Sequence, residues 1–154
     1  MQRASSWLLA SPMRRAVVIA SLLAIGTGAA FAQSAAIGQR KDQFKAMGGG
    51  AGPIGKMLRG EDAFDLAKVQ AGLRVIQANA KTLPTLFPDD SKAGDTKALP
   101  AIWEDKAKFN GYFAKLEADA TAALAAIKDE ATMKTEMPKV LGNCGTCHND
   151  FRAK

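Results

Sequence analysis

The spacing of apolar residues constrains the fold of this chain more than any other feature. From Ile37 onward, apolar residues recur at intervals of three and four, and no segment shows the strict alternation typical of strands. Four such stripes run from Ile37 to Leu58, from Leu66 to Leu83, from Phe109 to Ile127 and from Met133 to Phe151. A seven-residue repeat on several helices favours left-handed, nearly antiparallel packing. The sequence therefore predicts an all-α, up-and-down antiparallel four-helix bundle.

Local signals between the stripes set the expected helix boundaries. Residues 60–62 (Gly-Glu-Asp) separate the first two helices and put acidic side chains at a helix start. The second helix is expected to end at Leu83, because a residue before proline resists the helical conformation. Residues 84–99 form the one long loop, and Pro100 suits the first turn of the third helix. Residues 129–132 are expected to form a short hinge into the fourth helix.

One segment of the first stripe conflicts with a regular helix. Residues 48–53 read Gly-Gly-Gly-Ala-Gly-Pro, where each glycine costs up to about 1 kcal/mol and an interior proline about 3 kcal/mol relative to alanine. Because the apolar spacing continues across this segment, we expect a kinked helix from about Ala36 to Leu58, bent where Pro53 meets Gly49. The small residues would also let another backbone approach closely, either a neighbouring helix or a second subunit.

The N-terminal segment has the pattern of a secretory signal. Three arginines precede an apolar run from Ala16 to Ile25, and an A-x-A sequence ends at Ala32. The alternative is an uncleaved membrane anchor, but a spanning helix needs about 20 apolar residues and this run is shorter. We therefore expect cleavage after Ala32, which makes residues 1–32 a signal peptide and residues 33–154 the functional domain.

The basic composition depends strongly on this leader. The formal net charge is +6, and removing the leader's three arginines lowers it to +3. The charge is therefore not interpreted as a nucleic-acid binding surface. The remaining chain has a size typical of one domain.

The C-terminal end holds the chain's only two cysteines and its only histidine, in the run Cys144-Gly145-Thr146-Cys147-His148. Two thiols three residues apart on a helix lie on one face, where they can form thioethers with the two vinyl groups of one porphyrin. The adjacent imidazole can then bind the iron, so the C-x-x-C-H pattern indicates covalent attachment of one haem c. Cys144 and Cys147 fall on the apolar stripe of the fourth helix. The haem is therefore expected inside the bundle.

Three other uses of a cysteine pair fit the sequence less well. A closed zinc site normally needs four ligands, and no second Cys/His cluster completes the set. A redox dithiol is expected near a βαβ pattern, and no strand pattern is found. A disulfide across three residues would close too small a loop to stabilise much.

Several motifs together resemble cytochrome c′, a class II c-type cytochrome family with haem attachment near the C-terminus. The resemblance covers about Ala36 to Arg152. It is carried by residues 40–48 (RKDQFKAMG), 86–88 (LFP), 100–103 (PAIW) and 144–152 (CGTCHNDFR), of which the last is the most specific.

The resemblance implies roles for the residues around the iron. His148 would be the only protein ligand, which leaves a five-coordinate, high-spin centre. Phe44 would occupy the distal position, where low-spin relatives carry methionine, and would crowd the sixth site without coordinating. Met47, three residues further along the helix, is the competing ligand, because a thioether sulfur binds haem iron well.

Three further residues are expected to contact the cofactor. Arg40 sits on the apolar stripe and would bind a haem propionate, although it could also extend to solvent. Arg152 would lie beside the proximal face of the haem, or act as a basic residue at the helix C-terminus. Trp103 would pack against the haem edge.

The implied function is binding of nitric oxide or carbon monoxide in the periplasm, with a carrier, buffering or protective role and no enzymatic activity. The first alternative is electron transfer, for which exposed lysines could dock an acidic redox partner. The second is a haem enzyme such as a peroxidase, which needs distal acid–base groups that the sequence near Phe44 lacks beyond Arg40. No nucleic acid is expected as a partner, and no membrane after signal cleavage. The family resemblance allows a homodimer.

Overall fold

The computed structural model describes the backbone of residues 13–154, and the side chains of residue 33 and residues 35–154. The first 12 residues of the predicted signal peptide lie outside this range. The chain divides into two compact units between Ala32 and Gln33, the same position at which cleavage is expected. Within the described residues, no helix is both long and apolar enough to cross a membrane.

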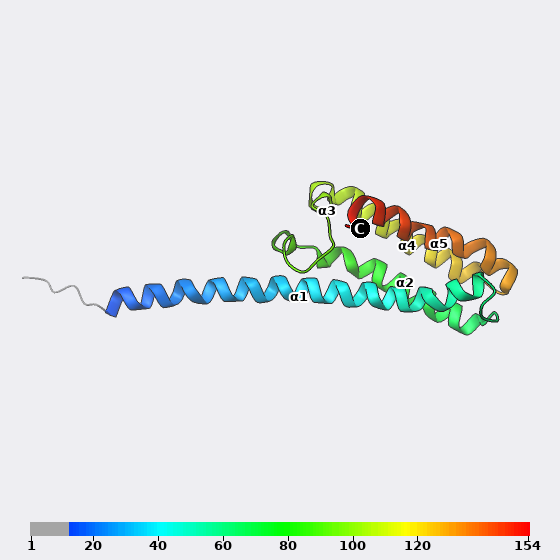
Figure 1. Cartoon of the computed structure of the whole chain (residues 1–154), viewed down its shortest axis with the longest axis horizontal. Helices are drawn as coiled ribbons and strands as arrows, with labels where there is room; N and C mark the ends of the chain where they lie inside the picture. The colour runs from blue at the N-terminus through cyan, green and yellow to red at the C-terminus, as the bar shows by residue number, and fades with distance from the viewer. Residues whose placement is uncertain (1–12) are drawn as a thin grey trace, which may run out of the picture. The chain divides into compact units, whose positions relative to one another are not determined.

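The second unit is a bundle of four long helices that alternate in direction (Figure 1). They are α1 (Met13–Leu58, of which residues 33–58 belong to this unit), α2 (Leu66–Thr82), α4 (Lys106–Ala126) and α5 (Glu130–Phe151). The segment between α2 and α4 contains two 3₁₀ turns, η1 (Leu83–Leu86) and η2 (Asp89–Ser91), and the one-turn helix α3 (Ala101–Glu104). This confirms the predicted all-α, up-and-down four-helix bundle.

The core is built from the apolar stripes that the sequence predicts. Residues of α1, α2, α4 and α5 form one cluster of buried side chains, joined by Leu83, Phe87 and Ile102 from the connecting segments. Burying such side chains is worth about 1.5–3 kcal/mol each. The most enclosed large members are Ile54, Val69, Leu73, Phe109, Ile127, Met133, Met137 and Val140.

Side-chain caps explain where two helices begin, and they correct two predicted boundaries. The third helix was expected to run on from Pro100, but it is interrupted at Asp105 (φ −129°, ψ 67°), whose carboxylate accepts a hydrogen bond from the Lys108 backbone N–H and starts α4. The expected hinge at residues 129–132 is instead the first turn of α5. Asp129 and Thr132 form a reciprocal capping box there, which satisfies N–H groups that a helix start leaves free.

The glycine-rich segment stays helical and lets two helices approach each other closely. α1 continues through Pro53 to Leu58 as expected, but it begins at Met13 instead of near Ala36. A Cβ atom added at Gly72 of α2 would lie 2.4 Å from the carbonyl oxygen of Gly50 in α1. The close backbone approach expected here is therefore made to a neighbouring helix of the same chain. The predicted bend at Pro53 stays a prediction.

We expect Gly72→Ala to destabilise the bundle by about 1–3 kcal/mol, because the new methyl group would overlap backbone of α1, which cannot rotate away. Chemical unfolding of the variant measures this change. Gly49→Ala is the matched control, because a Cβ there meets nothing within 4 Å; it should stabilise α1 by up to about 1 kcal/mol. Equal stability of the two variants would contradict the close packing of Gly50 on Gly72.

Candidate haem site

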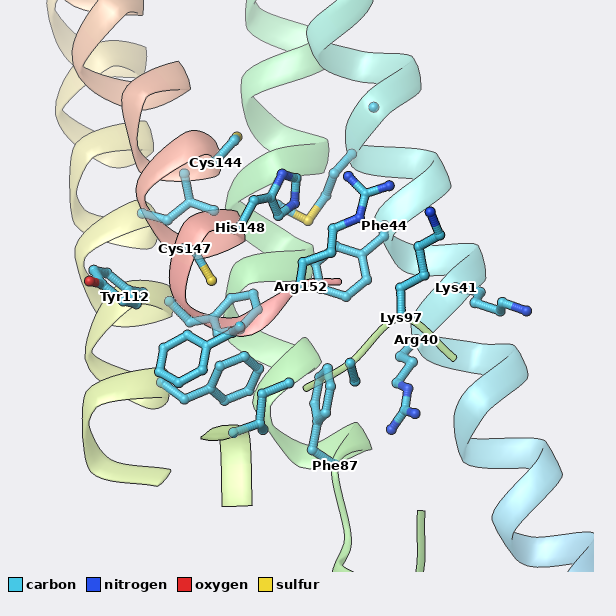
Figure 2. A pocket seen from close by; sticks show the side chains of 18 of the residues that line it. Arg40, Lys41, Phe44, Phe87, Lys97, Tyr112, Cys144, Cys147, His148 and Arg152 are labelled. Carbon is cyan, nitrogen blue, oxygen red and sulfur yellow. The ribbon is translucent and has the colours of Figure 1, made fainter. Parts of the chain in front are cut away.

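A cavity of about 730 Å³ opens into the bundle, lined by residues of all four long helices, of α3 and of the segment that precedes α3 (Figure 2). Its volume lies within the range of small-molecule and cofactor sites. The wall is mainly apolar, with Ile76, Phe87, Ile102, Phe109, Phe113, Leu116 and Phe151 among its residues. A cavity of this kind can enclose a flat, largely apolar cofactor.

The α5 wall of the cavity carries all three residues of the C-x-x-C-H motif (Figure 2). Cys144 and Cys147 are half-buried free thiols. Burial raises the pKa of Cys144, and it raises the pKa of Cys147 to about 11, with smaller contributions from Cys144 and Asp150. Both sulfurs are therefore protonated at neutral pH. This state does not favour a thiolate-based redox site or a metal–thiolate site.

His148 lies on the same wall and is poised to act as a ligand. Partial burial lowers the pKa of the imidazole, and the positive charge of Arg152 lowers it further. A lowered pKa keeps the ring neutral at physiological pH, and a neutral imidazole has the free nitrogen lone pair that iron requires.

The α1 wall carries Phe44 and Met47. Phe44 is 38% exposed and is the only large apolar side chain classed as exposed among the described residues. Its exposure has a simple cause, because the ring lines the cavity, with its centroid 6.3 Å from that of Phe113. Met47 lines the same cavity but is buried. The structure thus brings together the predicted distal residue and its predicted competitor.

Arg40 lines the cavity but is already heavily engaged. The side chain is 2% exposed, and its guanidinium donates to the Ser91 hydroxyl, the Ser91 carbonyl and the Thr96 hydroxyl at 2.8–3.1 Å. The guanidinium carbon also lies 4.7 Å from the ring centroid of Phe87, within cation–π range. Arg40 therefore fastens the segment before α3 to α1.

The two remaining predicted residues lie in different places. Arg152 is exposed and lines the cavity (Figure 2). Trp103 is not among the residues that line it. Its indole N–H points to the carbonyls of Phe87 and Pro88, and its ring lies 5.9 Å from Phe87. Trp103 thus supports the cavity wall from behind, through Phe87.

Three lining residues were missed in the sequence. Tyr112 donates a hydrogen bond to Asp150 at 2.8 Å, and the buried Asn143 donates one to Asp119 at 2.7 Å. Asn143 had a visible signal, since it is a polar residue three positions after Val140 on the apolar stripe of α5. Lys97 had none, because it lies in the long loop, where no periodicity places a side chain.

The donor set fits a covalent haem better than a closed metal site. Over the described part of the chain, no group of three or more His, Cys, Asp or Glu side chains is arranged to hold a metal ion. Two protonated thiols and one neutral histidine on a single helix, facing an apolar cavity, match what a covalently attached porphyrin needs. Fold and site together define a c-type haem protein built on a four-helix bundle.

Comparisons with known proteins agree with this class. A family model described as Cytochrome C' matches residues 35–152. A cytochrome c' of Rhodopseudomonas palustris is 56% identical over 141 residues, covering 91% of this chain and 97% of the relative. A cytochrome c-556 of Agrobacterium fabrum is 40% identical over 117 residues, covering 75% of this chain and 80% of the relative. A solved cytochrome c' structure from R. palustris superposes with a TM-score of 0.76 at 58% identity, covering 77% of this chain and 96% of that one. The chain belongs to the cytochrome c′ family.

Proposed function

We propose that this chain is an exported cytochrome c′ that binds nitric oxide or carbon monoxide at one covalent haem c. Cys144 and Cys147 would form the two thioethers, and His148 would be the axial ligand. The haem iron would supply a binding position for small gases. One observation carries the proposal: the motif in α5 and the partly exposed ring of Phe44 in α1 line the same cavity.

Phe44 is the residue that favours gas binding over electron transfer. Its ring cannot coordinate iron and occupies space on the α1 side of the cavity, so small diatomic molecules are favoured over larger ligands. The relatives include both cytochromes c' and cytochromes c-556. A nitric oxide complex of a cytochrome c prime variant from Alcaligenes xylosoxidans has the same fold, with a TM-score of 0.70 at 22% identity.

Two alternatives from other classes are weaker. Electron transfer through a six-coordinate iron would require Met47 as the second ligand, and Met47 is a largely buried residue of the wall, whereas Phe44 is partly exposed in the cavity. Peroxidase chemistry would require a distal acid or base. The carboxylate among the residues that line the cavity is Asp95, which is paired with Lys41 at 2.6 Å.

Export to the periplasm is supported by the junction between Ala32 and Gln33. The boundary between the two compact units falls at this point of the chain. An engineered R. palustris cytochrome c' whose structure is solved had its first residue changed, and the natural residue at that position is glutamine. Gln33 would be the first residue of this chain after the expected cleavage. N-terminal sequencing or intact mass of the exported protein tests this directly.

Two kinds of protein partner are proposed. A periplasmic redox partner would reduce the haem before gas binding. A second copy of the chain could pack on α1, where the positions of Gly48, Gly49 and Gly52 have open space around them.

Optical spectra of the purified ferric and ferrous protein, with and without nitric oxide, test the proposed function. We expect a high-spin protein that binds nitric oxide without first releasing a sixth ligand. A low-spin ferrous spectrum that Met47→Leu converts to high spin would instead favour electron transfer. If cells that attach haem to other c-type cytochromes export this protein folded but colourless, both the gas-binding and the electron-transfer function are overturned.

A further inference from the structure

We propose that Lys97 is the residue that receives a propionate carboxylate of the haem, and that Arg40 is a positioning residue for Lys97. This assignment rests on the proposed haem function. It replaces the direct contact between Arg40 and a propionate that the sequence suggested.

Arg40 is directed toward the loop more than toward the cofactor. Its hydrogen bonds to Ser91 and Thr96 use three of the five N–H donors of a guanidinium, and the side chain stacks on Phe87. In Figure 2 its guanidinium points away from Cys147 and His148. The neutral acceptors and the aromatic ring stabilise a buried charge without a carboxylate.

Lys97 is held at the cavity by bonds on both sides of it. The Thr96 hydroxyl accepts a hydrogen bond from Arg40 at 2.8 Å and another from the Ala98 N–H at 3.1 Å. The Lys97 carbonyl accepts one from the Ala153 N–H at 2.8 Å, next to the antiparallel bridge between Ala98 and Arg152. The Lys97 backbone is therefore fixed between α1 and the end of α5.

The Lys97 side chain is a free cation at the edge of an apolar cavity. It lines the cavity, and Figure 2 shows its chain extending along the cavity between Phe44 and Lys41. No salt bridge to Lys97 is found within residues 33–154, whereas its neighbour Lys41 is paired with Asp95. The other titratable or charged groups on the wall are Arg40 and Lys45 of α1, Tyr112 of α4, Cys144, Cys147 and His148 of α5, and Arg152 directly after α5.

The chemistry of the cofactor supplies the missing anion. Haem carries two propionate carboxylates, which need cationic or hydrogen-bonding partners when the rest of the ring lies in an apolar wall. A lysine ammonium on a fixed backbone can reach such a carboxylate at the cavity mouth without burying its charge completely.

The test compares Lys97→Met with Lys92→Met in the haem-loaded protein. Lys92 lies on the same loop but does not line the cavity. Its replacement by methionine changes the net charge of the protein by the same amount as Lys97→Met does. Infrared titration of haem with isotope-labelled propionate carboxyls reports propionate protonation, separately from Asp and Glu. In Lys97→Met, the proton affinity of one propionate should rise about ten-fold. Lys92→Met should change it less than about two-fold, and Lys97→Arg should restore the wild-type value.

The role of Arg40 is tested by a double-mutant cycle. If Arg40 acts through Lys97, then adding Arg40→Met to Lys97→Met produces no further rise in propionate proton affinity. Additive effects would assign a propionate to Arg40 itself and overturn the positioning role.

The outcomes separate this inference from the proposed function. A wild-type protein without covalent haem, as read from its intact mass, overturns both. A haem-loaded Lys97→Met variant that titrates like wild type, or like Lys92→Met, overturns only the inference.

Discussion

We expect the change of both Cys144 and Cys147 to serine to abolish covalent haem attachment. Serine hydroxyls do not add to vinyl groups to form thioethers, and no other cysteine exists in the chain to replace them. Both thiols are half-buried at the cavity wall and serine is nearly the same size, so the helical bundle should persist. Intact mass and haem staining after denaturation measure the covalent haem, and far-ultraviolet circular dichroism measures the fold.

Single variants and a neighbouring residue provide the controls. Cys144→Ser and Cys147→Ser should each retain one thioether and therefore some covalent haem. Thr146→Ala changes an exposed residue between them that does not line the cavity, and it should keep one haem per chain. Haem that stays attached to the double variant after denaturation would contradict the assignment of both thioethers.

The helices were predictable because their causes are local. α2 runs from Leu66, where its apolar stripe starts, to Thr82, next to the Leu83-Pro84 step. The acidic residues 61 and 62, which were expected at its start, precede it, and Asp65 is its N-cap. Apolar spacing places a stripe on each helix, and four stripes of similar length can bury one another only as a bundle. The C-x-x-C-H motif was predictable for the same reason, since its five residues lie within little more than one turn of one helix, which fixes its geometry.

The helix boundaries that were predicted wrongly lie where two local signals compete, one for continuing a helix and one for starting a new helix. Pro100 does precede a helical turn, but the Asp105 carboxylate caps the Lys108 N–H and starts a new helix five residues after α3 begins. Aspartate in a helical stripe is compatible with either a helix interior or a cap. At Asp129, the same type of cap extends α5 backward into the expected hinge.

The polar residues of the site were hardest to predict because their partners are distant in sequence. Arg40 contacts Ser91 and Thr96, more than 50 residues away. Lys97 is fixed by Ala153, at the far end of the chain. Loop segments such as residues 84–99 carry no periodicity, so nothing in the sequence indicates which of their side chains face a cavity. The family resemblance assigns Arg40 to the cofactor, and its bonds to the loop could not be predicted from the sequence.

Phe44→Met is expected to convert the protein from a high-spin, five-coordinate form to a low-spin, six-coordinate form. Residue 44 lines the cavity and is only partly covered, so the longer, flexible thioether can turn toward the iron. The two side chains have similar volume, and the cost in stability should stay below about 1.5 kcal/mol. Optical and electron paramagnetic resonance spectra of the ferric form measure the spin state.

Phe44→Leu is the matched control for this switch, because it replaces the ring with a smaller aliphatic side chain that cannot coordinate iron. It should remain high-spin, and its smaller volume should admit gas ligands more readily than Phe44 does. A Phe44→Met protein that is high-spin in both the ferric and the ferrous form would mean that residue 44 does not face the iron, since a thioether within reach of an open site on haem iron binds it. Combining Phe44→Met with Met47→Leu then identifies which sulfur binds. If the double variant is still low-spin, the ligand is the methionine at residue 44. If the double variant is high-spin, the ligand in Phe44→Met was Met47.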